Sequence, residues 1–373
     1  MKRKLKILEL TNFSAGICGV WQRVKQESMG LSRVGHEVRV FSSNAVKGSK
    51  EIAEDEESLG NIKIRRFPFK NLGGESFMSW NFERESIEYS PEVIIAHSYR
   101  HAHTLNALKV RDKLKKQGKK CRVFLVTHAP FVDTEVRGFA QSIIVKIYDF
   151  IVGRNTLKKF DKVIAITNWE IQYLVNLGVK KERISYVPNG IPEEFFKETK
   201  LGKGIFFLGR ISPVKNIETI IRSMKNVEST LDIIGPAEEN YKKKLMQTME
   251  SNGINNVRFL PAVYDLKKKI SLIDRYEIFV LPSITESMPQ SLIEAMARGK
   301  ICISSKTKGG KEIIKGGKNG FLFEIGNIHD LKEKINLILK MPEKEKKRIR
   351  KEAIKTAEKF KLSKIINDLG KLF

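Results

Sequence analysis

The sequence has 373 residues, 41% of them apolar, which is enough chain for two α/β domains with separate cores. The formal net charge of +26 makes nucleic acid, an anionic membrane and an anionic substrate candidate partners, although a heat-adapted Lys/Glu-rich surface would have the same composition. The sequence has no run of roughly 20 apolar residues that would span a membrane, and its three scattered cysteines argue against a disulfide framework and a zinc site.

Strands and helices alternate through the first half of the chain. A strand at residues 5–10, a helix at 20–34 that ends at Gly35, and a strand at 37–41 open the pattern. Further short apolar strands are expected at residues 61–67, 93–96, 122–126, 163–166 and 184–187. Alternating strands and helices predict a parallel, doubly wound sheet.

A second α/β pattern begins after the Pro/Gly/Asn-rich segment 187–192. Its expected strands are residues 204–208, 231–234, 257–260, 278–281 and 301–304, with helices at 216–224 and 290–298. A basic helical tail follows from residue 343. We therefore expect two Rossmann-like domains, covering residues 1–196 and 197–359, whose ligands bind at the carboxyl ends of the strands.

Two cations follow the first strand of the second half. Arg210 comes directly after Gly209, and Lys215 lies five residues further along, where Pro213 opens the next helix. Two cations beside a helix N-terminus can bind a phosphate, with arginine as a two-pronged donor and lysine as a point charge. A pair of solvated side chains in a turn is the alternative.

A longer motif spans residues 281–296. A buried strand ends at Pro282, the next loop contains Glu286, and Pro289 suits a first helical turn because it has no N–H to leave unpaired. The helix start then offers backbone N–H groups to phosphate oxygens. These groups belong to Met288, Gln290 and Ser291. Glu294, one turn further on, either reaches the same ligand or only supports the helix.

Taken together, these motifs resemble the retaining GT-B glycosyltransferases of family 4. The resemblance rests on the Glu286-x7-Glu294 pair, on Gly-Arg-x4-Lys upstream, and on Glu-Ala-Met-Ala-x-Gly at residues 294–299. Further matches in the expected order are residues 187–191, 234–235, 308–312 and 319–322. The resemblance implies an α/β fold of the GT-B type, two Rossmann-like domains facing each other across a cleft, with residues 360–373 returning to the first domain.

The resemblance also implies roles for the site residues. Arg210 and Lys215 would hold the donor diphosphate, Glu294 the ribose hydroxyls, and Glu286 the transferred sugar. The loops at Gly235 and Ala262 would bracket the base, although Pro261 stands where the family usually has glycine. The donor would be a UDP- or GDP-sugar. No cofactor or metal is expected, since no Asp-x-Asp motif follows a strand.

In the first half, the resemblance directs attention to Gly19 and His128. Gly19 lies between the first strand and its helix, where the family has a glycine pair; Cys18 takes the first position, and Gly16 is a candidate to supply the missing flexibility. His128 follows the strand 122–126 and matches a family histidine near the transferred sugar and acceptor. Without the resemblance, a turn glycine and a structural histidine would be the preferred interpretations.

Three more histidines, His97, His101 and His103, form a His-x3-His-x-His pattern. No acidic or cysteine partner completes a metal site in the sequence. We therefore expect His97 to end a strand facing the cleft and the other two to be solvated.

The segment 136–159 combines apolar residues with basic flanks, including Arg137. A helix covering the sheet is the preferred interpretation, and a helix lying on an anionic membrane is the alternative. In the latter case the acceptor would be lipid-linked and the protein peripheral on the inner face of the cell membrane; otherwise we expect a cytoplasmic protein.

We accordingly expect a hexosyltransferase-like enzyme acting on a glycan, a lipid-linked molecule or a small molecule. A nucleotide-sugar epimerase and a non-catalytic basic membrane-binding protein are the alternatives. No nucleic-acid partner is expected, because no RNA-binding aromatic signature or recognition helix is present.

Overall fold

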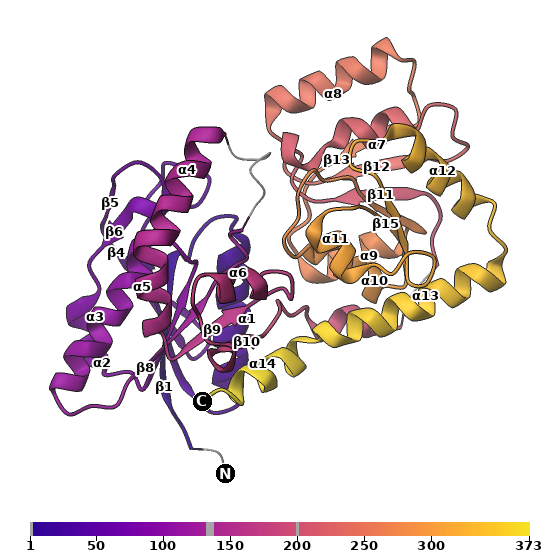
Figure 1. Ribbon diagram of the computed structural model, residues 1–373. Helices are drawn as coiled ribbons and strands as arrows, with labels where there is room; N and C mark the ends of the chain where they lie inside the picture. The colour runs from indigo at the N-terminus through magenta and orange to yellow at the C-terminus, as the bar shows by residue number, and fades with distance from the viewer. Residues whose placement is uncertain (1–2, 132–137, 199–200) are drawn as a thin grey trace. The chain divides into compact units, whose positions relative to one another are not determined.

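A computed structural model describes residues 3–131, 138–198 and 201–373. The chain forms two compact units, Met1–Gly190 with Leu362–Phe373, and Ile191–Lys361. Each unit is built around its own parallel β-sheet, with helices packed on the sheet (Figure 1). The α/β class and the two doubly wound sheets expected from the sequence are therefore confirmed.

The first unit contains an eight-stranded sheet in the order β10-β9-β8-β7-β1-β2-β4-β3. Every neighbouring pair is parallel except β3–β4. The strands are β1 (Lys6–Phe13), β2 (Glu37–Ser43), β3 (Glu56–Leu59), β4 (Ile62–Phe67), β7 (Val93–His97), β8 (Arg122–Val126), β9 (Lys162–Ala165) and β10 (Ile184–Tyr186). The strand order reverses between β1 and β7, so the carboxyl ends of these two strands form the switch point where such sheets bind ligands.

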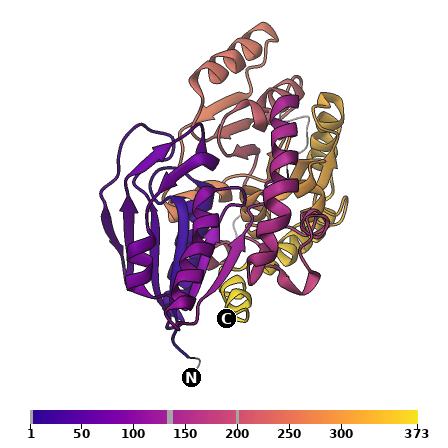
Figure 2. The ribbon, with the colours of Figure 1, turned by 60° about the vertical axis from the view of Figure 1, so that its left-hand side comes forward.

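Helices connect these strands. They are α1 (Gly19–Arg33), α2 (Glu83–Tyr89), α3 (Ala102–Lys116), α4 (Phe139–Tyr148), α5 (Arg154–Thr156), α6 (Ile171–Asn176) and the returning α14 (Leu362–Gly370). A five-residue π-helical turn, η2 (Asp149–Gly153), joins α4 to α5, and Figure 2 shows the three as one continuous rod. A small antiparallel ribbon pairs β5 (Phe69–Asn71) with β6 (Met78–Trp80).

The second unit contains a six-stranded, fully parallel sheet in the order β13-β12-β11-β14-β15-β16. Its strands are β11 (Ile205–Leu208), β12 (Leu231–Ile234), β13 (Val257–Leu260), β14 (Ile278–Leu281), β15 (Ile301–Ser305) and β16 (Phe321–Phe323). Its helices are α7 (Ile217–Ser223), α8 (Glu239–Ser251), α9 (Leu266–Asp274), α10 (Gln290–Ala297), α11 (Lys308–Ile313), α12 (Ile328–Leu339) and α13 (Glu343–Ala357). The central strands are apolar on both faces because helices cover both.

The boundaries between the units differ from those expected after residues 196 and 359. Ile191 and Phe195 are buried in the core of the second unit, and so is Phe360. The Ile191 N–H donates to the Phe360 carbonyl oxygen over 2.8 Å. The first boundary therefore lies directly after Gly190, and only α14, not Phe360, returns to the first unit.

Helix α14 packs on α1 at Gly30. A Cβ atom at Gly30 would lie 2.4 Å from Cγ1 of Ile366, so only glycine lets the two helices approach this closely. The buried face of α14 consists of Ile365, Ile366 and Leu369. In the described part of the chain, no helix is long and apolar enough to cross a bilayer.

Candidate functional site

The second unit places the two charged motifs at the carboxyl ends of neighbouring strands. Strands β11 and β14 pair in parallel, and Arg210 and Lys215 follow the first while Glu286 follows the second. The Ile284 N–H donates to the Val214 carbonyl oxygen over 2.9 Å, which ties the two loops together. The two loops therefore lie side by side.

Lys215 and Glu286 form an ion pair. Nζ of Lys215 lies 2.5 Å from Oε1 of Glu286, and the Ser283 hydroxyl donates to the same oxygen over 2.6 Å. The side chain of Lys215 is 24% exposed and that of Glu286 is 9% exposed. The pair is therefore accessible on its lysine side, where an anion can approach.

Arg210 is exposed. Across residues 3–131, 138–198 and 201–373, no hydrogen bond or ion pair involves its side chain. Its guanidinium group is consequently available for an anionic ligand. A direct contact with a diphosphate remains a prediction.

Glu294 lies on the buried side of α10 and pairs with Lys269 of α9. Nζ of Lys269 lies 2.7 Å from Oε1 of Glu294. This partner was not anticipated, because 25 residues separate the two in the sequence. A ribose contact by Glu294 remains a prediction, and it would require Lys269 to share the carboxylate or release it.

Helix α10 begins at Gln290, with Pro289 in the capping position, one residue before the first helical turn in which it was expected. Helix α11 supports the loop before α10 through Gly309, whose N–H donates to the Glu286 carbonyl oxygen over 2.9 Å. A Cβ at Gly309 would lie 2.6 Å from the Ser287 carbonyl oxygen and would displace the loop. Gln290 and Ser291 open the helix, so their N–H groups have no intrahelical partner.

The loops expected to bracket the base follow β12 and β13. Gly235 has φ of 149°, and a Cβ there would lie 1.9 Å from the Gly209 carbonyl oxygen. This glycine is therefore required by the fold itself. Ala262 is partly exposed beside the exposed Pro261. Base binding by either loop remains a prediction.

In the first unit, the turn before α1 depends on Gly16. Its φ is 80°, and a Cβ would lie 2.3 Å from the Lys47 carbonyl oxygen, so only glycine fits this turn. Gly19 opens α1, and no atom lies within 4 Å of a Cβ built there. The backbone at Gly19 is open to a ligand, as a binding role requires.

His128 has a left-handed backbone, with φ of 59°, and Ala129 follows with φ of 48°. Non-glycine residues adopt this conformation rarely, at a cost of about 1–3 kcal/mol each. Glu170 stabilises the strained turn: it accepts hydrogen bonds from the Thr127 hydroxyl over 2.6 Å and from the Ala129 N–H. Burial raises the pKa of Glu170 to about 7 despite these bonds.

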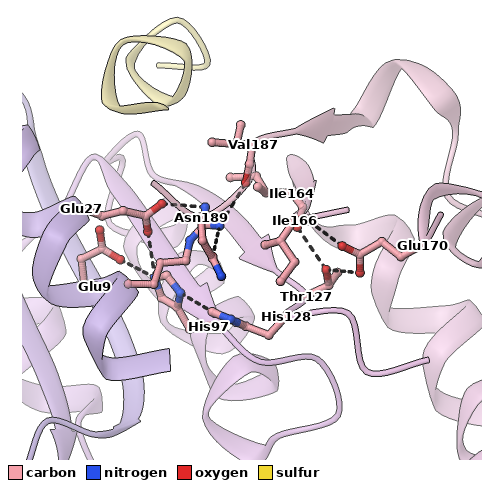
Figure 3. A network of polar contacts seen from close by, with 11 residues as sticks. Glu9, Glu27, His97, Thr127, His128, Ile164, Ile166, Glu170, Val187 and Asn189 are labelled. Atoms are coloured by element: carbon pink, nitrogen blue, oxygen red, sulfur yellow. Dashed lines mark hydrogen bonds and ion pairs between the residues drawn. The ribbon is translucent and has the colours of Figure 1, made fainter. Parts of the chain in front are cut away.

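A buried ionic cluster that was not predicted from the sequence contacts His128 through His97. Arg23 donates to Oε1 of Glu27 over 2.7 Å. Oε2 of Glu9 lies 2.7 Å from Nε2 of His97 (Figure 3). Arg23 also donates to the Val187 carbonyl oxygen. A charged residue inside the buried strand Ile7–Leu10 was the available signal, because such strands are otherwise apolar.

The donor atoms of Glu9, Glu27 and His97 all lie within 4.8 Å of one another, close enough to consider a metal ion. The set does not fit one, because the Arg23 guanidinium already supplies the positive charge in direct contact with Glu27. A divalent cation would be repelled at this distance. We therefore interpret the group as an internal ion-pair network.

The expectation for the other histidines was partly wrong. His97 ends β7 as expected, but it is fully buried, and His103 is 1% exposed rather than solvated. Nε2 of His103 lies 2.8 Å from the His97 carbonyl oxygen, and its ring stacks on Trp80. His103 begins the inward face of α3, a position that the His-x-His spacing did not indicate.

Two family sequence models match the chain. The family described as "Glycosyltransferase Family 4" matches residues 17–195, and "Glycosyl transferases group 1" matches residues 191–356. Together they span both units of the fold.

Individual relatives agree with the family matches. An uncharacterized glycosyltransferase of Methanocaldococcus jannaschii is 24% identical over 369 residues, covering 89% of each chain. The Escherichia coli protein named UDP-Gal:alpha-D-GlcNAc-diphosphoundecaprenol alpha-1,3-galactosyltransferase is 29% identical over 185 residues, covering 41% of this chain and 44% of its own. The structure of Anabaena HepE in complex with UDP-glucose superposes with a TM-score of 0.72 at 18% identity, covering 98% of each chain.

Proposed function

This chain belongs to the GT-B glycosyltransferases of family 4, and we propose that it moves a sugar from a nucleoside diphosphate to an acceptor hydroxyl, with retention at the anomeric carbon and without a metal ion. The ion pair between Lys215 and Glu286 carries the proposal. It lies at the ends of neighbouring strands, beside the N-terminus of α10 and the exposed Arg210.

The chemistry of the reaction explains why these groups are needed. Breaking the bond between the sugar and the diphosphate leaves negative charge on the diphosphate. Lys215, Arg210 and the first N–H groups of α10 would stabilise that charge, as preorganised donors do. Glu286, held by Lys215 and Ser283, would accept a hydrogen bond from a hydroxyl of the transferred sugar.

A uridine diphosphate sugar is the proposed donor. The name of the E. coli relative contains UDP-Gal, and HepE has the same fold and was solved with UDP-glucose. Thermal unfolding with UDP, GDP and ADP, each with its sugar forms, tests the proposal. A nucleotide at 100 times its Kd stabilises the folded protein by about 2.7 kcal/mol.

We expect UDP and UDP-sugars to raise the Tm, with or without EDTA, and GDP or ADP to raise it less. Release of UDP from the UDP-sugar in the presence of an acceptor should follow. A protein whose Tm responds to no nucleotide, and which releases none from any donor, would contradict the proposed function.

A lipid-linked acceptor at an anionic membrane surface is the second part of the proposal. The name of the E. coli relative includes a diphosphoundecaprenol-linked acceptor. Along α4 and η2, a row of large apolar side chains is 42–64% exposed, so this face of the segment is not covered by the first unit. These side chains are Ile143, Ile144, Ile147, Phe150 and Ile151.

The opposite side of this rod is anchored to the first unit. Asp149 accepts hydrogen bonds from the Tyr99 hydroxyl over 2.9 Å and from Arg100 over 2.6 Å. Gly153 packs against the Tyr99 hydroxyl. The anchor fixes which face is exposed, and the Arg154 guanidinium borders that face, 4.9 Å from the centre of the Phe150 ring. Arg137, which was part of the predicted segment, lies outside the described residues.

Replacing Ile144, Ile147 and Ile151 by serine is therefore expected to abolish flotation with anionic lipid vesicles while leaving the Tm nearly unchanged. Each side chain is more than half exposed, so its loss removes little buried area from the fold. Flotation of the unmodified protein should weaken as salt is raised.

The matched control replaces Leu337 by serine, because this residue is also half exposed but lies on α12 of the second unit. The control should float as the unmodified protein does. If the unmodified protein fails to float even at low salt, this part of the proposal is wrong, whereas the donor experiment is unaffected.

A further inference from the structure

Three side chains on neighbouring strands form an unbranched chain of hydrogen bonds. Glu9 lies on β1, His97 ends β7 and His128 follows β8, and these strands are adjacent in the sheet. Oε2 of Glu9 is 2.7 Å from Nε2 of His97, and Nδ1 of His97 is 3.0 Å from Nε2 of His128 (Figure 3). His97 therefore uses one ring nitrogen toward each neighbour, and His128 uses Nε2 toward His97.

This chain of hydrogen bonds runs from the core toward the surface. Glu9 and His97 are completely buried, whereas His128 is partly exposed. Nδ1 of His128 has no hydrogen-bond partner among residues 3–131, 138–198 and 201–373. Of the ring nitrogens of His97 and His128, Nδ1 of His128 is thus the one left for a bound hydroxyl group.

The charged groups around Glu9, His97 and His128 determine which of the three are ionised. Arg23 pairs with Glu27, and Oε2 of Glu27 lies 3.6 Å from Nε2 of His97. One guanidinium compensates one carboxylate, so burial raises the pKa of Glu9 to about 8 and lowers that of His97 to about 4. Burial also lowers the pKa of His128, with a further contribution from the charges of His97, Arg23 and His101.

Because both imidazole rings are neutral and Glu9 titrates, the tautomers of His97 and His128 depend on whether Glu9 is protonated. When Glu9 is protonated, it donates to Nε2 of His97, which must then carry its hydrogen on Nδ1 and donate to His128. His128 in turn carries its hydrogen on Nδ1. When Glu9 is ionised, every hydrogen moves by one place, and Nδ1 of His128 becomes a hydrogen-bond acceptor.

We propose that Glu9, His97 and His128 form a proton relay that takes up the proton of the acceptor hydroxyl group at Nδ1 of His128. The inference rests on the proposed sugar transfer, which requires a hydroxyl to lose its proton. His128 would be the catalytic residue, and Glu9 and His97 are positioning residues that determine its tautomer.

The step balances along the chain. The acceptor O–H bond breaks, and an N–H bond forms at Nδ1 of His128 while its Nε2–H bond breaks. An N–H bond forms at Nδ1 of His97 while its Nε2–H bond breaks, and Glu9 gains the last proton. The acceptor oxygen keeps its electron pair and bonds to the anomeric carbon, and the diphosphate leaves with the other pair.

The relay can be tested in the free protein by two-bond ¹⁵N–¹H correlation spectra of histidine-labelled samples, which show which ring nitrogen carries hydrogen. Between about pH 6 and about pH 9, His97 and His128 should change together from the Nδ1–H to the Nε2–H tautomer, following the pKa of Glu9. The signals are assigned with His128→Asn.

The other histidines provide internal controls. His101 bonds the Tyr99 carbonyl oxygen through Nδ1, and His103 bonds the His97 carbonyl oxygen through Nε2. Each should therefore keep one tautomer throughout. A His128 signal that keeps one tautomer over the whole range overturns the relay.

The catalytic step has a separate readout in the pH dependence of kcat. Activity should rise with pH as Glu9 ionises, and Glu9→Gln should remove this rise and lower kcat at about pH 8 by about 10²-fold or more. The introduced glutamine is neutral, as Glu9 is at lower pH, so the fold should persist. Glu27 is not part of the hydrogen-bond chain, so the kcat of Glu27→Gln should still rise with pH.

A rise that survives Glu9→Gln overturns the proton transfer. If the unmodified protein transfers no sugar, the proposed function fails, and the tautomer spectra still decide whether the relay exists.

Discussion

Replacing Lys215 by alanine is expected to lower kcat by about 10²–10³-fold, because one preorganised donor to developing charge is worth about 2.7–4 kcal/mol. The Tm should change little. The Lys215 side chain is 24% exposed, and Glu286 keeps its hydrogen bond from Ser283 when the lysine is removed. Steady-state kinetics with saturating donor, together with thermal unfolding, measures both quantities.

Lys334→Ala is the matched control. This lysine also pairs with a carboxylate, that of Asp330 over 3.3 Å, and its side chain is 32% exposed on α12. We expect it to retain the unmodified kcat. Wild-type turnover in both Lys215→Ala and Arg210→Ala would exclude the diphosphate role assigned to these cations.

Replacing Arg23 by methionine is expected to cost about 3–5 kcal/mol of unfolding free energy, the usual range for removing one partner of a buried ion pair. Methionine keeps much of the volume but leaves Glu27 and Glu9 without a compensating charge, and the Val187 carbonyl oxygen without its donor. Urea unfolding of the first unit, followed by tryptophan fluorescence, measures the loss.

The loss should grow with pH. Arg23 holds the pKa values of Glu9 and Glu27 down, so its removal raises both. A carboxyl group whose pKa is higher in the folded state loses stability as pH rises from its ordinary value of 4.5. The variant should therefore be closer to the unmodified protein at about pH 5 than at about pH 8.

Arg84→Met is the control, since Arg84 and Glu88 form the same i,i+4 pair on α2 but are largely exposed. Its unfolding midpoint should not move measurably. Equal effects at both positions would contradict the structural role assigned to burial at Arg23.

The central strands of both sheets were predicted correctly from the sequence. Runs such as Ile278–Leu281 and Ile205–Leu208 are buried on both faces, so their apolar composition alone identifies them. It missed β3 and the β5–β6 ribbon: β3 and β5 are largely exposed, and β5 and β6 have only three residues each. Pairing with a neighbour, not composition, defines those strands.

The candidate site was predicted where residues adjacent in sequence carry it, as for the loop around Glu286. It was not predicted where partners come from distant segments. Glu294 meets Lys269 from another helix, and Glu170 reaches back to the turn of His128. Such pairs depend on how the helices pack, which local patterns do not encode.

The return of α14 to α1 affects the order in which the protein can be completed during translation. The first unit lacks the helix that covers Gly30 until the ribosome has made the whole second unit. Domains generally fold as they emerge, amino-terminal first, but here the earlier domain must wait with part of its apolar surface uncovered. The nascent chain is therefore most exposed to aggregation or chaperone capture late in its synthesis.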